Sequence, residues 1–404
     1  MSPDYWNTEA TLNVLMVVLG VVPFHTGGGV AMVNWAILHE LRSRGHKVMV
    51  ATQIKNPVQE HMQAVADIGA GLLVYEGNQL DLGSCPDFTP DVIFCYTSSA
   101  IQQCSSFLPS IPRVCSLVDL DHLISLYRRQ YYARSQPLTY IDIVGHHQQA
   151  MAVKDSVIPL LQTCHSLIEH AAHHNKWLNE IAGVNCTYIP MPVIDHMFLG
   201  WVRDIRTRPV KTYTNPTFMP RITLAGHLAG VATLSGLYFL AEDVLPNYKD
   251  DPKVRFFISG AEGLFHDLAT RMRPYVDNGW VTLQGYLPDI QKEMMNSNVV
   301  LVPTPIDLGF RTRIVEAWSL GCCVITHPAN LLGMPEAKVG ENILAPSTGK
   351  EMAEMVREVA WDVEVQQKIG QEARKSYEEH YKGSESKVVD LIEQAVEEPV
   401  SVGS

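Results

Sequence analysis

The polar residues best placed for chemistry lie just after a short apolar run at residues 299–302. Arg311 and Arg313 follow in a loop, and Glu316 comes next on a segment that a glycine ends before a second apolar run at 323–326. This order predicts a strand, a charged loop, a helix and a second strand. Open α/β sheets bind ligands at the carboxyl ends of their strands, where this loop would lie. Guanidinium groups there suit a phosphate, although an ordinary strand–helix–strand crossover has the same outline.

A run of three glycines, Gly27, Gly28 and Gly29, stands between the first apolar run and a helical pattern. Glycine lets the backbone approach a ligand closely, and the free N–H groups at the start of the following helix attract anions. The spacing is not that of a dinucleotide-binding fingerprint. We therefore expect a loop that faces an anionic ligand, with a tight turn of no further role as the alternative.

Two carboxylates and an imidazole, Asp119, Asp121 and His122, follow the apolar run at 114–118. At the end of a strand they would open into a cleft, where they could bind hydroxyl groups, relay a proton or coordinate a metal. A helix N-cap with a solvated neighbour is the alternative. We predict catalytic roles for Asp119 and His122, and no metal site.

The densest basic and aromatic cluster runs from Tyr127 to Arg134, in a chain that is otherwise acidic. As a helix it would place Tyr127, Tyr131 and Arg134 on one face, with Arg128 on the flank. We predict that Arg128, Arg129 and Tyr131 dock an anionic ligand, such as a lipid-linked phosphate or an acidic glycan, or contact a membrane surface. Solvated helix surface is the alternative.

Several histidines between residues 165 and 174 would form a metal cluster if they shared one helix. Residues 167–170 read better as a strand and residues 173–182 as a helix, which breaks the spacing that a metal site would need. We expect His170 and His173 at the edge of a cleft, in contact with ligand.

Short apolar runs alternate with helical patterns in both halves of the chain, which predicts parallel sheets covered by helices on both faces. The strands expected in the first half are Val14–Val18, Val48–Thr52, Leu72–Tyr75, Val92–Tyr96, Val114–Val118, Leu167–His170 and Thr187–Ile189. Those expected in the second half are Ile222–Ala225, Val254–Ser259, Val281–Leu283, Val299–Val302, Cys323–Thr326 and Ile343–Ala345. Helices are expected at Gly349–Ala360, Val363–His380 and Ser384–Glu397.

Composition narrows the class of protein. The 404 residues suit two domains, and the net charge of -12 argues against a nucleic-acid partner, which would need a broad basic face. The 8 cysteines are irregularly spaced, which suits a reducing compartment, so we expect a cytoplasmic protein, peripheral to a membrane at most. The apolar stretch Leu12–Phe24 lacks the basic start of a signal peptide, and we interpret it as a buried strand.

The residues from Gly309 to Thr326 closely resemble the donor-site signature of the GT-B glycosyltransferases, especially the large retaining family numbered 4. The run from Arg44 to Val48 resembles a second hallmark of the same enzymes, near their amino terminus. The family pattern has two glutamates. Glu316 stands at the second position, whereas Leu308, with Asp307 beside it, stands at the first, whose glutamate contacts the donor sugar.

The resemblance implies the GT-B fold, an α/β fold of two Rossmann-like domains whose parallel sheets face each other across a cleft. Residues 1–205 would then form the acceptor-binding domain and residues 206–220 the linker. Residues 221–380 would bind the nucleotide sugar. Residues 381–404 would form a C-terminal helix that packs back on the N-terminal domain.

The resemblance also implies a set of site residues. Those expected to bind the donor are Gly28, Gly29, Gly226, His227, Gly260, Tyr286, Leu287, Arg311, Thr312, Arg313 and Glu316. Those expected to bind the acceptor are Arg128, Arg129, Tyr131, His170 and His173. His227 and Ser235 stand where the family usually has an arginine and a lysine that grip the diphosphate. Either Arg311 and Arg313 meet that charge, which we expect, or donor binding is weakened or lost.

The implied function is the transfer of a hexose-type sugar, with retention, from a nucleoside diphosphate sugar to a hydroxyl group of a glycan, a lipid-linked acceptor or a small molecule. No metal or other cofactor is expected, because protein cations and helix dipoles would neutralise the diphosphate. Two alternatives stay open: a nucleotide-sugar epimerase on the same fold, and a catalytically inactive binding partner. The sequence does not indicate the nucleotide, the sugar, the acceptor or the oligomeric state.

Overall fold

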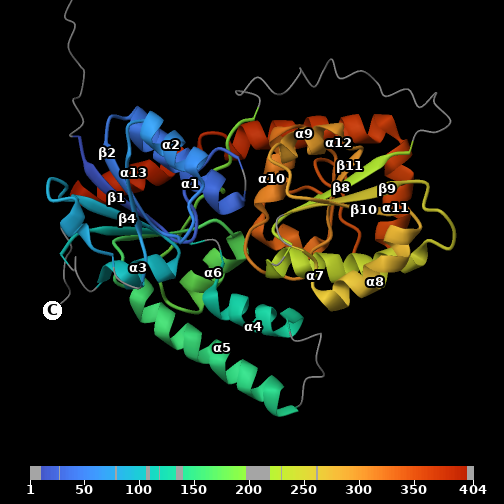
Figure 1. Ribbon diagram of the computed structural model, residues 1–404, viewed down its shortest axis with the longest axis horizontal. Coiled ribbons are helices and arrows are strands. Elements are labelled where there is room, and N and C mark those ends of the chain that lie inside the picture. The colour runs from blue at the N-terminus through green and yellow to red at the C-terminus, as the bar shows by residue number, and fades with distance from the viewer. Residues whose placement is uncertain are drawn as a thin grey trace, which may run out of the picture.

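Two parallel sheets, one in each half of the chain, form the framework of the molecule (Figure 1). The computed structural model describes residues 11–26, 28–77, 80–105, 110–117, 119–132, 140–196, 219–228, 230–260 and 263–397. Most of the expected linker, residues 206–218, therefore lies outside the described residues, as do Gly27, Val118 and Arg134. No helix within these ranges has both the length and the apolar character needed to cross a bilayer.

The first sheet has seven parallel strands in the order β3-β2-β1-β4-β5-β6-β7. Their bounds are β1 Asn13–Val18, β2 Lys47–Gln53, β3 Gly71–Tyr75, β4 Val92–Tyr96, β5 Arg113–Leu117, β6 Ser166–Glu169 and β7 Thr187–Tyr188. β1 lies in the middle, and Val14 to Val18 are wholly buried because helices cover both faces of the sheet. The strand order reverses between β1 and β4, so the loop after β1 opens at the point where such sheets bind ligands.

Among the described residues, six α-helices connect these strands: α1 Gly29–Ser43, α2 Gln59–Asp67, α3 Ser98–Ser105, α4 Asp121–Tyr132, α5 Tyr140–Leu161 and α6 Ala172–Glu180. In α1 the buried side chains Val33, Ile37, Leu38 and Leu41 form one face against the sheet. α4 and α5 pack on each other and project below the sheet (Figure 1). α4 also contacts α7 of the second half, Val231–Phe239, so it joins the two halves on that side of the molecule.

The second sheet has five parallel strands in the order β10-β9-β8-β11-β12. Their bounds are β8 Arg221–Ala225, β9 Arg255–Ser259, β10 Val281–Gly285, β11 Val299–Val302 and β12 Val324–Thr326. The helices beside α7 are α8 His266–Asp277, α9 Ile290–Asn296, α10 Thr312–Ser319, α11 Gly349–Trp361 and α12 Val363–Ser376.

One expected strand of the second half, Ile343–Ala345, is wrong. Leu344 makes only an isolated bridge with Ile325 beyond β12. Pro346, two residues after Leu344, has no backbone N–H to donate, so the pairing stops before a ladder can form.

The last helix, α13 Ser384–Glu397, returns to the first sheet, where it contacts α1, β4, β5 and β6. The chain turns there through a single wide helical turn at Tyr377–Tyr381. In Figure 1 the red α13 lies among the blue elements, whereas α12 lies with the second sheet. The chain therefore connects the two halves a second time near its end.

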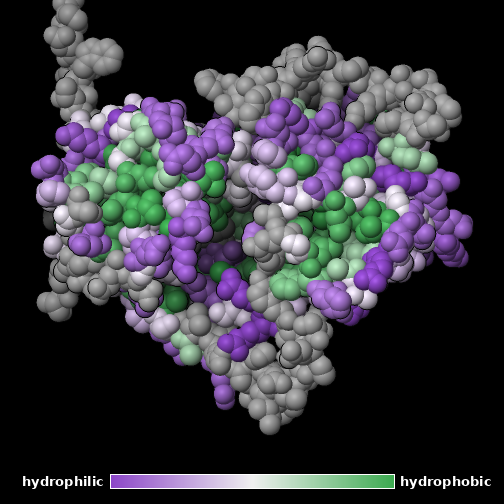
Figure 2. Space-filling model, viewed as in Figure 1, coloured by the Kyte–Doolittle hydropathy of each residue, from purple (hydrophilic) through white to green (hydrophobic). Residues whose placement is uncertain are grey.

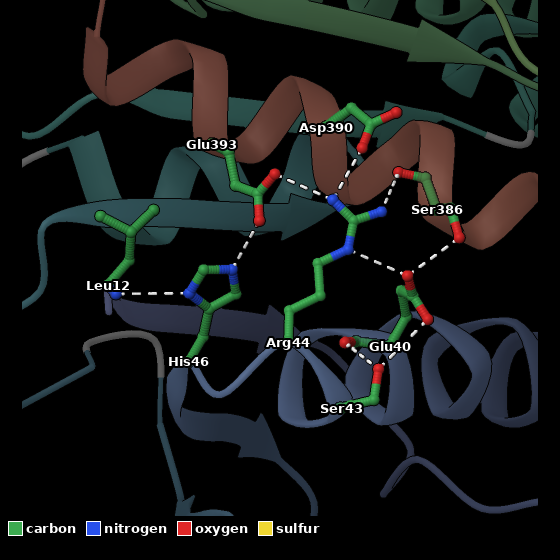
Figure 3. A network of polar contacts seen from close by, with 8 residues as sticks. All are labelled: Leu12, Glu40, Ser43, Arg44, His46, Ser386, Asp390 and Glu393. Carbon is green, nitrogen blue, oxygen red and sulfur yellow. Dashed lines mark hydrogen bonds and ion pairs between the residues drawn. The ribbon is translucent and has the colours of Figure 1, made fainter. Parts of the chain in front are cut away.

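A polar network fixes α13 on the first half (Figure 3). Arg44 Nη1 donates to Asp390 Oδ1 at 2.7 Å and to Glu393 Oε2 at 2.9 Å. His46 accepts the backbone N–H of Leu12 at its Nδ1, so its Nε2 carries the proton and donates to Glu393 Oε1 at 2.8 Å. Arg44 thus bonds the carboxylates of α13 from the end of α1, which gives the Arg44–Val48 run a structural role.

Candidate active site between the two domains

A cavity of about 260 Å³ opens between the two halves, where the loops that follow β1, β8, β9, β10 and β11 meet. Figure 2 shows the two lobes with a hollow between them. Every residue that the sequence assigns to donor binding lines this cavity. The loops meet here because all strands of both sheets are parallel and present their carboxyl ends to the same space.

Two helix N-termini point into the cavity, one from each half. Gly28 is the N-cap of α1, and Arg311 is the N-cap of α10. They approach closely, because a Cβ atom on Gly29 would stand 2.6 Å from Thr312 Oγ1. Neither N-cap residue has a side-chain cap, so the first N–H groups of both helices are available to a ligand. The partial positive charge at both ends favours an anion.

The loops after β8 and β9 admit only glycine at two positions. A Cβ on Gly226 would overlap the guanidinium of Arg313, and a Cβ on Gly260 would overlap the carbonyl of Gly226. Arg313 therefore extends from α10 across the loop after β8, where His227 is exposed. A cation from α10 thus reaches the loop at which the expected arginine is missing. Ala261 and Glu262, which follow Gly260, lie outside the described residues.

Arg311 and Arg313 place two cations in the cavity with little compensation. Burial lowers the pKa of Arg313 to about 10, and Arg311 lowers it further, whereas Glu316 raises it. Burial also lowers the pKa of Arg311, against the attraction of Asp119. Among the described residues, Glu316 is the group whose charge opposes the effect of burial on Arg313. Such a desolvated pair of cations is stabilised by an anionic ligand.

Glu316 stands in the cavity wall and is only 4% exposed. Burial raises its pKa to about 7, and the hydrogen bond from Gln291 and the charge of Arg313 oppose that rise. Gln291 Nε2 donates to Glu316 Oε1 at 2.7 Å. His196 Nε2 lies 3.7 Å from the same oxygen, but burial lowers the pKa of His196 to about 4, so this contact joins a neutral ring to the carboxyl group.

The wall opposite the helix N-termini comes from the end of β10. Tyr286 is 58% exposed and lines the cavity together with Leu287. Ser259, at the end of β9, lies beneath them and donates to Gln284 Oε1 at 2.7 Å. An aromatic ring in this wall can stack on the flat face of a ring system, and the backbone groups beside it can form hydrogen bonds with the edge of that ring system.

Asp119 lies beside the cavity, on the first half. Its Oδ1 is 3.9 Å from Arg311 Nη2, and 32% of its side chain is exposed. The pKa of Asp119 is raised by burial and by Asp121, and lowered by Arg311. Asp119 Oδ1 has no hydrogen-bond partner among the described residues. The nearby Asp121 is held by the hydroxyl of Ser98.

His122 is not brought together with the donor residues. Its ring lies 5.0 Å from the ring of Trp177. It lines a separate small pocket with Trp177 and Lys154, and Asp119 lines that pocket as well. Burial and the charge of Lys154 lower its pKa. Of the two residues expected to be catalytic, only Asp119 therefore lies near the cavity.

Two expected acceptor residues are wrong. His170 is completely buried, and its two ring nitrogens are bonded to Ser116 Oγ at 2.7 Å and to the carbonyl of Ile189 at 2.8 Å. Tyr131 is 6% exposed and packs against Tyr238 of α7, with ring centroids 6.1 Å apart. Both side chains belong to packed interfaces, one in the core of the first half and the other between the halves.

The other expected acceptor residues have mixed positions. Arg128 is exposed and Arg129 is partly exposed on α4. His173 reaches across to the second half, where its Nε2 donates to the carbonyl of Asp307 at 2.8 Å. Among the residues that the structure describes, no three His, Cys, Asp or Glu side chains gather in a way that could hold a metal ion.

Sequence reasoning missed Gln291 and His196, whose side chains lie 2.7 Å and 3.7 Å from Glu316 Oε1. Gln291 lies on α9 and His196 lies just before the residues outside the description. Neither stands in a motif, because each reaches Glu316 only through the packing of separate elements. Leu308, at the position of the family's first glutamate, points into the core of the second half.

Comparison with known proteins finds a family match in the second half of the chain. Residues 220–362 match the family model of the group 1 glycosyl transferases. No curated protein matches the chain significantly.

Several solved structures match the whole chain in fold. The HepE protein of Anabaena, in complex with UDP and glucose, aligns with a TM-score of 0.66 at 16% identity, covering 96% of this chain and 98% of HepE. Sucrose-phosphate synthase of Thermosynechococcus elongatus aligns at 0.67 and 12% identity, covering 95% of this chain and 99% of the synthase. A glycosyltransferase of Rickettsia africae aligns at 0.65 and 12% identity, covering 96% and 99%. The fold predicted from the sequence, two Rossmann-like domains in the GT-B arrangement, is confirmed.

Proposed function

Because residues 220–362 belong to the group 1 glycosyltransferases and the two domains form the GT-B fold, we propose that this chain transfers a hexose-type sugar from a nucleoside diphosphate sugar to a hydroxyl acceptor. We further propose that the transfer retains the anomeric configuration, needs no metal, and places the enzyme in glycosyltransferase family 4.

The observation that carries the proposal is the pair Arg311 and Arg313 at the N-terminus of α10, facing the glycine loop before α1. Breaking the sugar–phosphate bond leaves negative charge on the departing diphosphate. Two desolvated guanidinium groups and two helix N-termini are already in place to stabilise that charge. In this arrangement the cations replace the charge that a metal ion would otherwise supply.

Glu316 and the β10 loop suit the remainder of the donor. The carboxylate of Glu316 would accept hydrogen bonds from the ribose hydroxyls, and Tyr286 and Leu287 would flank the base. UDP is the first nucleotide to test, because a structure of the same fold, HepE, was solved with UDP and glucose. At 16% identity, the similarity to HepE supports a shared fold but not a shared ligand. The other nucleotides are therefore tested in the same experiment.

The acceptor would enter from the first domain. Asp119 is a carboxylate of that domain within 3.9 Å of Arg311. Its Oδ1 has no hydrogen-bond partner among the described residues and is placed to bond a hydroxyl group of the sugar or the acceptor. No protein nucleophile is assigned. The reaction would depend on holding donor and acceptor in the closed cleft, at the distance that the chemistry needs.

Calorimetric titration of the chain with UDP, GDP, ADP, TDP and CDP tests the proposal. We expect one of these to bind and its sugar conjugate to be consumed only when a hydroxyl acceptor is added. Turnover of the free nucleotide sugar without acceptor would favour the epimerase. Failure of all five to bind would favour an inactive partner protein.

A further inference from the structure

The backbone of residues 307–309 is held from both domains, immediately before the cationic end of α10. Leu308 anchors the segment in the core of the second domain, where it is buried. The peptide groups on either side of Leu308 face the first domain instead. Phe310 and Arg311 follow directly after this segment, so its position determines where the guanidinium of Arg311 stands.

Two adjacent histidines of α6 make the contacts from the first domain. His173 Nε2 donates to the carbonyl of Asp307 at 2.8 Å. The backbone N–H of Gly309 donates to His174 Nε2 at 3.3 Å. One ring must therefore carry a proton on Nε2 and the other must lack it. The rings lie beside each other, with centroids 4.1 Å apart.

The second histidine is suited to be a permanent acceptor. His174 is 2% exposed, and burial, with His173 beside it, lowers its pKa to about 3. It therefore stays neutral throughout the physiological range, with Nε2 free to accept from Gly309. The groups that face the pair are the backbone of residues 307–309, Arg311 and His122.

A third contact comes from α4. The hydroxyl of Tyr127 donates to Asp307 Oδ1 across the same interface. Tyr127, His173 and His174 thus bind three successive groups of one loop: the side chain of Asp307, its carbonyl, and the N–H of Gly309. Beyond this loop, Asp119 lies within 3.9 Å of Arg311 from the same domain.

We propose that His173 and His174 are positioning residues for Arg311: they fix the 307–309 segment from the first domain and thereby place the guanidinium that meets the donor diphosphate. Strong binding of the diphosphate would then require the domains to be closed. A first-domain helix would control a second-domain site that it does not touch. This inference rests on the proposed function, because it assumes that Arg311 contacts a nucleoside diphosphate.

The test compares a diphosphate with its nucleoside in calorimetric titrations, using UDP and uridine, or the corresponding pair for whichever of the five nucleotides binds. In His174→Ala we expect the affinity for the diphosphate to fall about five- to tenfold, the effect of losing one hydrogen bond and its alignment. The affinity for the nucleoside should stay within about twofold of wild type, because a nucleoside lacks the phosphates that Arg311 would meet. His174→Gln should recover most of the loss, since its side-chain oxygen can accept from Gly309.

Two further variants keep the test decisive if His174→Ala does not fold. Tyr127→Phe removes one hydroxyl and should lower the affinity for the diphosphate two- to fivefold, roughly the effect of one partly exposed hydrogen bond. Lys176→Ala, on the exposed side of α6, is the matched control and should bind both ligands as wild type does.

If the wild type binds no diphosphate, the proposed function fails and this inference with it. If the wild type binds and the folded His174→Ala or Tyr127→Phe loses nothing, or loses nucleoside and diphosphate affinity equally, only the positioning role is overturned.

Discussion

At the scale of single residues, the cavity between the two halves holds two desolvated cations, and the carboxylates near them, Asp119 and Glu316, balance their charge only in part. Arg311 and Arg313 are desolvated, and the pKa of the nearby carboxyl group of Glu316 is raised to about 7, so near neutral pH it offsets the two cations only in part. A protein that buries such groups loses stability unless a ligand supplies the missing charge. The free protein is therefore expected to be less stable than its complex with a nucleoside diphosphate.

Glu316 gives a prediction about stability and pH. Its folded-state pKa, about 7, lies above the unfolded value, so the protonated group favours the folded state and this contribution is lost as the pH rises through 7. Glu316→Gln cannot ionise and should therefore be more stable than wild type at pH 8, by on the order of 2 kcal/mol, and similar to it at pH 4.5. Urea unfolding at both pH values measures the difference. A variant less stable than wild type at pH 8 would show that the carboxylate is held by attractive contacts.

The same residue gives a prediction about binding. If the ribose hydroxyls bond the carboxylate of Glu316, nucleoside affinity should rise as the pH increases from 6 to 8, through the pKa of about 7. A nucleoside is the right probe, because it has no phosphate whose own ionisation would confuse the profile. Glu316→Gln should bind the nucleoside about tenfold more weakly at pH 8, the loss of a hydrogen bond to a charged group, and should show a flat profile. An unchanged affinity in the folded variant would remove Glu316 from the donor site.

At the scale of elements, α4 has one face against the second domain and another in solvent. Tyr127 and Tyr131 occupy the interdomain face, and Arg128 and Arg129 remain outside it. The basic cluster seen in the sequence is therefore divided. Only its arginines remain candidates for an anionic acceptor.

The division of α4 sharpens the acceptor prediction. Arg128→Ala combined with Arg129→Ala should raise the KM for an anionic acceptor and leave the affinity for the donor nucleotide unchanged. The wild-type acceptor KM should also rise with salt, because exposed charges are screened over about 10 Å at 0.1 M. Initial-rate kinetics at several salt concentrations measure both effects. An acceptor KM that does not depend on salt would make these arginines ordinary solvated surface.

α13 is the other element with a specific test. Arg44 is 21% exposed and bonds two carboxylates of α13 (Figure 3). Arg44→Met keeps the apolar stem and removes the charge, so it should destabilise the docking of α13 by about 1–3 kcal/mol. Faster amide hydrogen exchange over residues 384–397 would report the loss. Lys387→Ala, an exposed position on the same helix, should exchange as the wild type does.

At the scale of the whole molecule, the sequence predicted the fold, most of its strands and helices, and the return of the last helix to the first domain, but not the side-chain contacts that form when distant elements pack together. Strands β1 to β12 could be predicted because each depends on a local apolar run of suitable length. The residues expected to bind the donor line one cavity because the parallel strands present their carboxyl ends to the same space. His170 and Tyr131 were misplaced because their burial depends on packing between elements far apart in the chain. Gln291 and His196 were missed for the same reason: each meets Glu316 only once α9, α10 and the end of the first domain are assembled.

The central claim is that Arg313, extended from α10 across Gly226, supplies the diphosphate charge that the loop after β8 lacks. The most direct measurement is the calorimetric affinity of Arg313→Met for a nucleoside diphosphate and for the matching nucleoside. We predict a loss of about ten- to hundredfold for the diphosphate and little change for the nucleoside, since the lost contact is charge-assisted. The free variant should be at least as stable as wild type, because a desolvated charge has been removed. Equal losses for both ligands, or an unchanged diphosphate affinity, would contradict the account.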